Sequence, residues 1–522
     1  MIHLKRAALA AAAMAAPLPA LAQEAASVSL DQRVNDIFAG STGWFVSLIF
    51  APLPFAVGGV AFPWIVLWLV VGATVFTIYF GFIQFRAFGH AISLVKGDYS
   101  DPDDAGEVSH FQALATALSG TVGLGNIAGV AVAVGIGGPG ATFWMIVAGL
   151  LGMASKFTEC TLGVKYRNEY PDGHVSGGPM YYMVKGFTER GLPGGKVLAV
   201  LFSVFCIGGA LGGGNMFQAN QAHAQISGLV GDYPGWITGI VFALVVFAVI
   251  VGGIKSIAKV TEKVVPFMGL LYVTAALIVL IVNYDMIGTA FGQIFAGAFT
   301  GLGVAGGFVG ALIQGFRRAA FSNEAGVGSA AIAHSAVRTK EPITEGVVSL
   351  LEPFIDTVVI CTMTALVITI SGVLVTDAET GLFVLNEAGT AIQTVGDVGG
   401  VQLTSAAFAT GLSWFPSVLA LAVVLFAFST MISWSYYGLK AWTYLFGEGK
   451  TKELIFKVIF CLFVIVGAAA DLLAVIDFSD AMIFAMAVVN ITALYCLMPI
   501  VKREMKSYFS RLDTGEIRKH GT

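Results

Sequence analysis

Long apolar stretches dominate the sequence, and charged residues are confined to the segments between them. About eleven stretches are long enough to cross a membrane as helices, each of which needs roughly 20 apolar residues. Positive charge gathers in alternate connections, while the remaining connections hold acids or no charge. Because positive connections stay in the cytoplasm, the pattern predicts an all-α polytopic protein of the bacterial inner membrane. Its N-terminus is expected in the periplasm and its C-terminus in the cytoplasm.

The composition supports a membrane protein. Hydrophobic residues make up 57% of the chain and charged residues 11%, against about a quarter charged in soluble domains. No long polar segment interrupts the apolar pattern, so one membrane domain is expected over 61–502, followed by a cytoplasmic tail over 503–522. The net charge of −4 gives no reason to expect nucleic acid as a partner. The five cysteines are scattered, which predicts neither a zinc site nor a disulfide framework.

The first residues have the layout of a secretory signal. Lys5 and Arg6 precede the apolar run Ala7 to Ala16, and small residues follow at Ala20 and Ala22. This layout predicts a cleaved signal peptide over 1–22, the alternative being an uncleaved extension. Residues 23–60 would then form a periplasmic segment. The helical spacing of its apolar residues between Ser27 and Phe50 predicts a short helix on the membrane surface.

The second apolar stretch contains a polar, glycine-rich segment where a membrane helix should be continuous. Residues Gly120 to Asn126 read GTVGLGN, and each glycine costs a helix about 1 kcal/mol relative to alanine. Unwound backbone at membrane depth needs protein or a water-filled cavity around it. It exposes carbonyls that can bind a cation, and the following half-helix offers amides to a carboxylate. The segment therefore predicts an interrupted binding helix.

Two other interpretations of this segment exist. Gly125 and Gly129 are spaced for close packing against another helix. A dinucleotide-binding fingerprint is disfavoured, because no strand precedes the glycines and no acid follows about 20 residues later.

A second glycine-rich segment, Thr300 to Gly307, lies in the seventh stretch and predicts another interrupted helix. The two interruptions are five stretches apart, and an odd offset reverses the direction in which a helix crosses the membrane. Stretches two to six and seven to eleven are therefore predicted to form a 5+5 inverted-repeat core after one N-terminal helix. Paired interruptions of this kind point to a transport site near the middle of the membrane.

Polar residues inside the fourth and ninth stretches add candidates for that site. Asn215 and Gln218 are three residues apart on one predicted helix, so we expect them to project together into a cavity. In the ninth stretch the adjacent hydroxyls of Ser429 and Thr430, with Ser433 a turn away, suit a small desolvated cation, although such hydroxyls can instead bond to carbonyls of their own helix. His223 is expected to be a hydrogen-bonded interior histidine, the alternative being a proton relay.

Other polar residues have less defined roles. Lys156 and Glu159 are three residues apart and are expected to form a structural ion pair. The segment Phe321–Ser329 is either a gate or a structural turn. Glu352 and Asp356 are expected to lie in a polar cytoplasmic vestibule.

Several of these motifs together resemble the alanine/glycine:cation symporter family. The motifs are GTVGLGNIAG at 120–129, GGPGATFWM at 137–145, GGPMYY at 177–182, FSNEAGVGS at 321–329 and FST at 428–430. The resemblance covers essentially everything after Phe62, and the signal-like leader is not part of the family's pattern. It implies a sodium-dependent carrier of small amino acids with a leucine-transporter-type fold and one extra N-terminal helix.

On this resemblance we expect a small neutral amino acid, alanine or glycine, to be carried inward with a sodium ion and without a cofactor. The carboxylate of the substrate would meet the first interruption at Thr121, Gly123, Leu124 and Gly125. Its ammonium group would meet carbonyls near Thr300 and amide oxygens of the fourth helix, at Gln218 and Asn215. Met431 and Trp434 would close a small pocket. Sodium would lie among Ser119, Val122, Asn126, Ser429 and Thr430.

Three other functions fit the sequence less well. Proton coupling would use Glu159, His223 or Asp356, and a channel could also contain half-helices. A membrane enzyme is disfavoured, since no nucleophile–base pair, metal cluster or phosphate-binding loop stands out.

Overall fold

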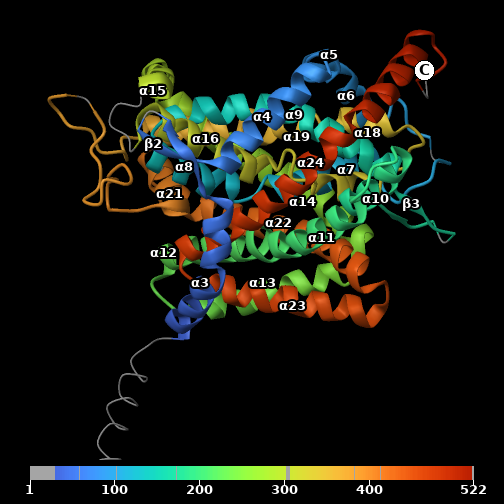
Figure 1. Cartoon of the computed structure of the whole chain (residues 1–522). Coiled ribbons are helices and arrows are strands. Elements are labelled where there is room, and N and C mark those ends of the chain that lie inside the picture. The colour runs from blue at the N-terminus through green and yellow to red at the C-terminus, as the bar shows by residue number, and fades with distance from the viewer. Residues whose placement is uncertain are drawn as a thin grey trace, which may run out of the picture.

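The computed structural model describes residues 30–57, 59–101, 103–171, 173–300, 306–380, 382–411 and 413–519. The signal-peptide prediction for 1–22 lies outside these residues. Long helices run side by side across Figure 1, and the C-terminal helix extends beyond them at one end. The connection between α20 (Thr362–Ile370) and α21 (Gly400–Gly411), drawn in orange, projects from the other end.

Six helical segments among the described residues are long and apolar enough to cross a membrane. They are α9 (Gly140–Lys165), α11 to α12 (Gly195–Val230), α14 (Gly253–Val282), α18 to α20 (Pro342–Ile370), α22 (Phe415–Phe446) and α24 (Leu472–Asp513). A seventh candidate is the pair α7 (His110–Thr121) and η1–α8 (Gly125–Gly137), which is bent by 50°. The prediction of a helical, multi-pass membrane protein is therefore confirmed.

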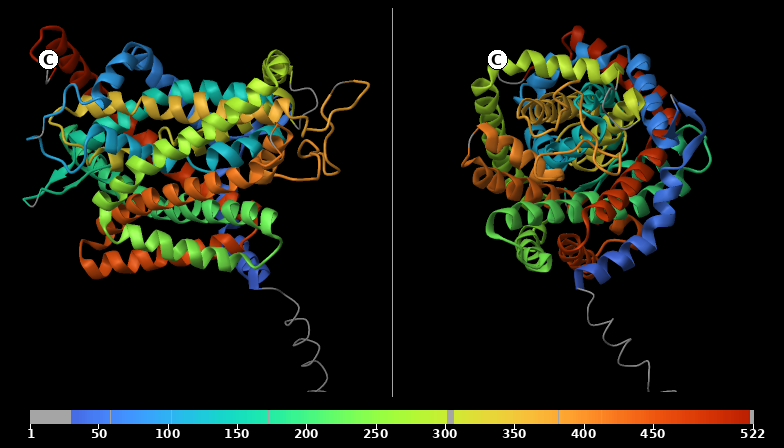
Figure 2. Two further views of the ribbon diagram at one scale, coloured as in Figure 1. Left: turned by 180° about the vertical axis from the view of Figure 1, so that it is seen from behind. Right: turned by 90° about the vertical axis from the view of Figure 1, so that its left-hand side faces the viewer.

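The remaining helices are shorter or more polar. They are α3 (Leu30–Ile49), α4 (Trp64–Tyr79), α5 (Ile83–Arg86), α6 (Phe88–Val95), α10 (Pro179–Glu189), α13 (Gly235–Ile250), η3 (Tyr284–Met286), α15 (Ile287–Thr300), α16 (Gly307–Asn323), α17 (Ala330–His334) and α23 (Lys450–Ala469). Two short antiparallel hairpins join β1 (Pro52–Val57) to β2 (Val60–Pro63) and β3 (Asn168–Glu169) to β4 (Val175–Ser176). Helices α13 and α23 pack together as an outer layer beside α11 (Figures 1 and 2).

Three of the long helical segments contain π-helical turns. These turns are η1 (Gly125–Gly129), η2 (Gly212–Met216) between α11 and α12, and η4 (Phe354–Cys361) between α19 (Leu351–Pro353) and α20. Such turns interrupt the regular backbone ladder and often mark functional sites. The first two fall on the glycine-rich segments of the second and fourth apolar stretches, and the third contains Asp356.

The seventh stretch has a break after Asn323 that was not predicted. Helix α15 ends at Thr300, which is exposed and donates its hydroxyl to the carbonyl of Ala296 (2.7 Å). Helix α16 then continues to Asn323, where Glu324 adopts a left-handed conformation, and α17 begins only at Ala330. The interruption predicted at Thr300–Gly307 falls mainly on residues 301–305, which lie outside the described residues. Gly306, immediately before α16, has a positive φ of 77°.

The N-terminal part of the described chain is helical, since α3 occupies Leu30–Ile49 inside the predicted range. The ring of Phe45 stacks on Phe205 of α11 at 5.8 Å, so α3 packs against the bundle. Its position at a membrane surface remains a prediction.

The C-terminal tail begins as a continuation of α24, which runs to Asp513. Arg511 donates from two nitrogens to the two carboxylate oxygens of Glu341 (2.8 and 2.6 Å), and Lys519 donates to Asp98 (2.8 Å). The ammonium group of Lys519 lowers the pKa of the Asp98 carboxyl below its ordinary value. These pairs hold the tail against the segments that precede α18 (Pro342–Val348) and α7.

Candidate functional site

The break after α7 is shaped by the side chains that pack against it. A capping box at Ser109 and Gln112 starts the helix, which leaves helical geometry at Val122 and resumes as the π-helical turn η1. At Gly123 an added Cβ would lie 2.3 Å from Oγ1 of Thr430 and 3.3 Å from Oε1 of Gln218. Only glycine fits this position, because side chains from two other helices approach its backbone directly.

Two backbone amides of this break are bound by side-chain oxygens. The N–H of Gly123 donates to Oδ1 of Asn126 (2.9 Å), and the N–H of Leu124 donates to Oε1 of Gln218 (3.1 Å). Gln218 in turn donates its amide nitrogen to the carbonyl of Gly213 in η2 (2.9 Å). Side-chain amide oxygens of Asn126 and Gln218 therefore accept from two of the backbone amides at which a substrate carboxylate is predicted to bind.

Other residues predicted to contact the substrate lie differently. The hydroxyl of Thr121 donates to carbonyls of its own helix at Ala117 and Leu118. Asn215 donates to the carbonyl of Phe460 on α23 (2.6 Å), so it does not project with Gln218. The expectation that the two share a face assumed a regular α-helix, whereas the π-helical turn η2 ends between them.

Three residues of the predicted cation site meet where α7 crosses α22. Oγ of Ser119 donates to the carbonyl of Ser429 (2.6 Å), and Oγ1 of Thr430 donates to the carbonyl of Ser119 (3.0 Å). Ser429 donates to the carbonyl of Phe426 in its own helix (3.0 Å), as the alternative interpretation expected. All three side chains are buried, and Val122 lies at the adjoining end of α7. The arrangement concentrates oxygen ligands suited to a hard cation.

Asn126 faces another buried oxygen cluster. Its amide nitrogen donates to the backbone carbonyl and Oδ1 of Asp356 (3.0 and 2.6 Å). Asp356 also accepts hydrogen bonds from Ser322 (2.9 Å) and Thr357 (2.6 Å). Sequence reasoning placed Asp356 in a cytoplasmic vestibule, but its side chain is fully buried where the breaks of α7 and α16 meet.

The segment Phe321–Ser329, left open as a gate or a turn, contains the second break. Ser322 lies beside the first break, since a Cβ at Gly125 would be 3.4 Å from its Cα. Asn323 donates to Oγ1 of Thr357 (2.9 Å), and Gly326 and Gly328 have positive φ. Sequence reasoning missed this break because Thr300–Gly307 is richer in glycine. The run Ser-Asn-Glu after an apolar helix was the signal that could have located it.

The two residues predicted to close the pocket are buried on α22. Met431 has no exposed surface, and Trp434 is 1% exposed. The indole of Trp434 lies against η2, where a Cβ on Gly214 would be 2.1 Å from its Cγ. Its Nε1 donates to Glu324 at the second break (3.0 Å). Trp434 therefore connects the breaks in the fourth and seventh stretches.

Comparison with known proteins identifies the family. A sequence model described as "Sodium:alanine symporter family" matches residues 55–521. The chain belongs to the sodium:alanine symporter family. The sodium/alanine symporter AgcS of Methanococcus maripaludis is 41% identical over 455 residues, which cover 87% of this chain and 94% of that protein. A probable sodium/glutamine symporter, GlnT of Bacillus subtilis, is 32% identical over 445 residues, 84% of this chain and 87% of that one.

The structure of MhsT in complex with L-phenylalanine shares the fold. It aligns with a TM-score of 0.50 at 14% identity and covers 77% of this chain and 99% of that chain. The predicted leucine-transporter-type fold of this symporter is therefore confirmed.

Beside the second break the symporter contains a buried charged cluster, formed by His110, Lys156, Glu159, His334, Glu345 and Glu352. Nζ of Lys156 lies 3.1 Å from Glu352 and 3.9 Å from Glu159, which confirms the predicted ion pair. His334 bonds to Glu345 through one ring nitrogen and to Glu352 through the other. Cys160, His334 and Glu352 are close enough to hold a metal ion, but the histidine nitrogens are engaged and Lys156 supplies the positive charge.

His223 is hydrogen-bonded to Thr238 (3.0 Å), as expected of an interior histidine.

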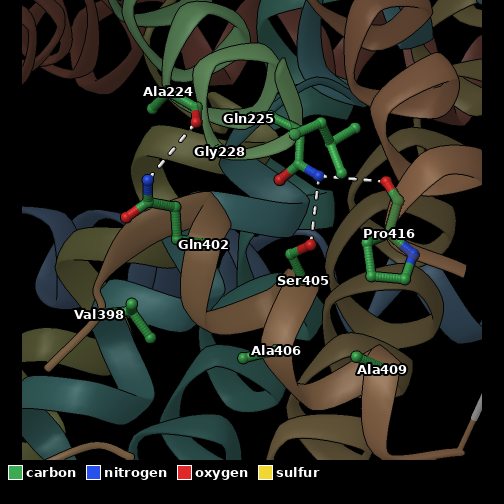
Figure 3. A pocket seen from close by; sticks show the side chains of 10 residues that line it. Ala224, Gln225, Gly228, Val398, Gln402, Ser405, Ala406, Ala409 and Pro416 are labelled. Carbon is green, nitrogen blue, oxygen red and sulfur yellow. Dashed lines mark hydrogen bonds between the residues drawn. The ribbon is translucent and has the colours of Figure 1, made fainter. Parts of the chain in front are cut away.

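A cavity of about 340 Å³ lies away from the breaks, between α12 (Phe217–Val230), α21 and the start of α22 (Figure 3). Gln225 donates to Ser405 and to the carbonyl of Pro416 (both 3.2 Å), and Gln402 donates to the carbonyl of Ala224 (3.4 Å). On its other side α21 covers η1, because Thr404 donates to the carbonyl of Ile127 (3.0 Å). Helix α21 thus packs over the first break and is hydrogen-bonded to α12.

Proposed function

We propose that this protein is a secondary active transporter that carries a small neutral amino acid, alanine or glycine, into the cell with sodium. The observation that carries the proposal is the meeting of buried oxygens of Ser119, Ser429 and Thr430 at the break of α7. The names of two relatives, the sodium/alanine symporter AgcS and the probable sodium/glutamine symporter GlnT, support the same activity.

The proposed topology has eleven spans. They are α4, α7 with α8 (Val130–Gly137), α9, α11 with α12, α13, α14, α16 with α17, α18 to α20, α22, α23 and α24. The alternation of positive connections supports a periplasmic N-terminus and a cytoplasmic C-terminus in the inner membrane. With α4 as the extra helix, the remaining ten spans form two inverted halves. Spans two and seven occupy matching positions in these halves, and both are interrupted.

When the substrate binds, its carboxylate oxygens would replace protein oxygens as hydrogen-bond acceptors at the first break. The carboxylate would replace the side-chain oxygens of Gln218 and Asn126 at the amides of Gly123 and Leu124. The released Gln218 oxygen would then be free to accept from the ammonium group. Trp434 and Met431 would limit the size of the side chain, since one methylene in such a pocket changes binding by about 1–3 kcal/mol.

The cation would join two parts of the bundle. The hydroxyls of Ser429 and Thr430 would rotate from carbonyls toward the ion, and the carbonyls of Ser119 and Val122 would complete its oxygen shell. Because the ion would connect α7 to α22, its binding would favour one arrangement of these helices. The same coupling would act in both directions, so sodium and substrate would each raise the affinity of the other.

Replacing Thr430 with alanine tests this site. We expect Thr430→Ala to raise the sodium concentration for half-maximal uptake at least tenfold, or about 1.4 kcal/mol, because one oxygen ligand is lost. The preference for alanine and glycine should remain. The measurement is uptake of radiolabelled alanine into proteoliposomes over a range of sodium gradients.

Ser435→Ala is the matched control, because Ser435 is buried on the same helix and its hydroxyl donates to the carbonyl of Ile432 in that helix (2.6 Å). Its sodium dependence should equal that of the wild type. An unchanged sodium dependence in Thr430→Ala would contradict the assigned site. Uptake by the wild type in sodium-free medium, driven by an imposed pH gradient, would contradict sodium coupling and indicate proton coupling.

A further inference from the structure

Glu324 occupies an unusual backbone position at the second break. Its φ of 54° lies in the left-handed region, which among the described non-glycine residues is also adopted only by Phe82 and Asp397. Its side chain is 2% exposed. A strained conformation at a buried, interrupted helix persists where surrounding contacts require it, and such positions cluster at functional sites. The contacts of the Glu324 carboxylate therefore need an explanation.

The Glu324 carboxylate is held by neutral donors. Oε1 accepts from Nε1 of Trp434 (3.0 Å), and Oε2 accepts from the hydroxyl of Ser329. No ion pair to Glu324 occurs within the described chain, whereas the neighbouring Glu352 is paired with Lys156 and His334. The Glu324 carboxyl group is thus directed at the indole and forms no ion pair with the described residues of the buried charged cluster.

The ring of Trp434 fits tightly against the fourth span. Glycines of the fourth span make room for its ring, because a Cβ at Gly214 or Gly209 would lie 2.1 or 3.4 Å from indole carbons. The ring of Tyr437 packs edge-on at 5.4 Å. Nε1 is the only polar atom of the indole side chain, and Glu324 accepts its single hydrogen. The orientation of the ring is therefore set by packing on one side and by Glu324 on the other.

We propose that Glu324 is a positioning residue that fixes the indole of Trp434 and thereby sets the size of the substrate pocket. The proposal rests on the proposed function, in which Trp434 limits the substrate side chain. A fixed indole excludes residues larger than alanine, because the ring cannot turn without losing its hydrogen bond to a buried carboxylate. Release of the indole would admit larger side chains.

The test compares four single variants in proteoliposomes. The measurement is inhibition of labelled alanine uptake by unlabelled alanine, valine and leucine, which gives a selectivity ratio even for poorly transported compounds. Glu324→Ala should reduce the preference for alanine over leucine at least tenfold, and Trp434→Phe, which lacks the donor, should do the same. Glu324→Gln keeps an acceptor oxygen and should restore most of the selectivity. Ser329→Ala removes only the hydroxyl that donates to Oε2 of Glu324, so the preference for alanine over leucine should be unchanged.

The double variant Glu324→Ala/Trp434→Phe provides the decisive comparison. If the two residues act through one hydrogen bond, its selectivity should equal that of either single variant. Additive effects would overturn the proposal, as would a Glu324→Ala variant that takes up alanine more slowly at unchanged selectivity. If Glu324→Ala does not fold, the comparison is made between the single variant Trp434→Phe and the double variant Trp434→Phe/Glu324→Gln. These two variants must then show the same preference for alanine over leucine. Wild-type protein in the same preparation tests the proposed function separately, because a lack of sodium-dependent alanine uptake would reject that function irrespective of the variants.

Discussion

Gly123→Ala should reduce sodium-driven alanine uptake at least a hundredfold. The added methyl group would lie 2.3 Å from Oγ1 of Thr430 and 3.3 Å from Oε1 of Gln218. Relief of this overlap must displace one of these side chains or the break itself, and such overpacking costs about 1–3 kcal/mol even without a ligand. Since the same atoms are proposed to bind the substrate and the cation, both affinities should fall. Initial uptake rates in proteoliposomes measure the effect.

Gly129→Ala is the matched control, because it adds a methyl group to the same interrupted helix at a position with no atom within 4 Å of the new Cβ. Its uptake should stay within about twofold of the wild type. Adding Thr430→Ala to Gly123→Ala removes the atom that clashes, so thermal stability should recover while the sodium response stays weak. Normal uptake by Gly123→Ala would show that the break is wider than the structure indicates.

Lys156→Met should lower the free energy of unfolding by about 3–5 kcal/mol, the cost of leaving a buried partner charge uncompensated. Lys156 has no exposed surface and lies between Glu352 and Glu159, which are equally buried. Glu352 would retain only His334 as a charged partner. The measurement is the midpoint of thermal denaturation in detergent, with and without alanine and sodium.

Lys340→Met provides the comparison for a solvent-accessible ion pair. Lys340 lies 3.7 and 3.5 Å from Asp101 and Asp104, and its side chain is 69% exposed. Exposed pairs contribute little because water and salt screen them, so the midpoint should barely move. Equal midpoints for Lys156→Met and the wild type would mean that the buried cluster does not depend on the lysine charge.

The sequence predicted features that follow from strong, local composition rules. Apolar length gave the multi-pass helical class, and the glycines between Gly120 and Gly125 located the first break, where the structure shows a close approach by Thr430. The hydroxyls of Ser429 and Thr430 were assigned with the help of the family resemblance. Their contact with Ser119 could not be deduced from spacing alone, because it joins helices 310 residues apart in sequence.

The errors have a common physical cause. Glycine density marks any place where the backbone must turn, so the glycine-rich run Thr300–Gly307 drew attention away from the break after Asn323. That break contains fewer glycines and is held by side chains such as Asn323 and Glu324. Asn215 was misplaced because a single π-helical turn rotates all later residues relative to it. Hydrogen bonds between side chains of distant helices, such as those of Asp356, produce no periodic pattern in the sequence. Their partners therefore could not be predicted from it.

Helix α21 contains no charged residue. Val401 donates its N–H to Gln221 (3.0 Å), Gln402 and Ser405 contact α12, and Thr404 contacts η1. Neutral hydrogen bonds of this kind are almost unaffected by ionic strength or proton concentration. In the proposed orientation, the contacts of α21 with α12 and η1 face the periplasm, where the salt concentration and the pH follow those outside the cell. The ion-paired tail would face the cytoplasm, so the contacts of α21 should persist when external salt or pH varies, whereas those of the tail are exposed to cytoplasmic conditions only.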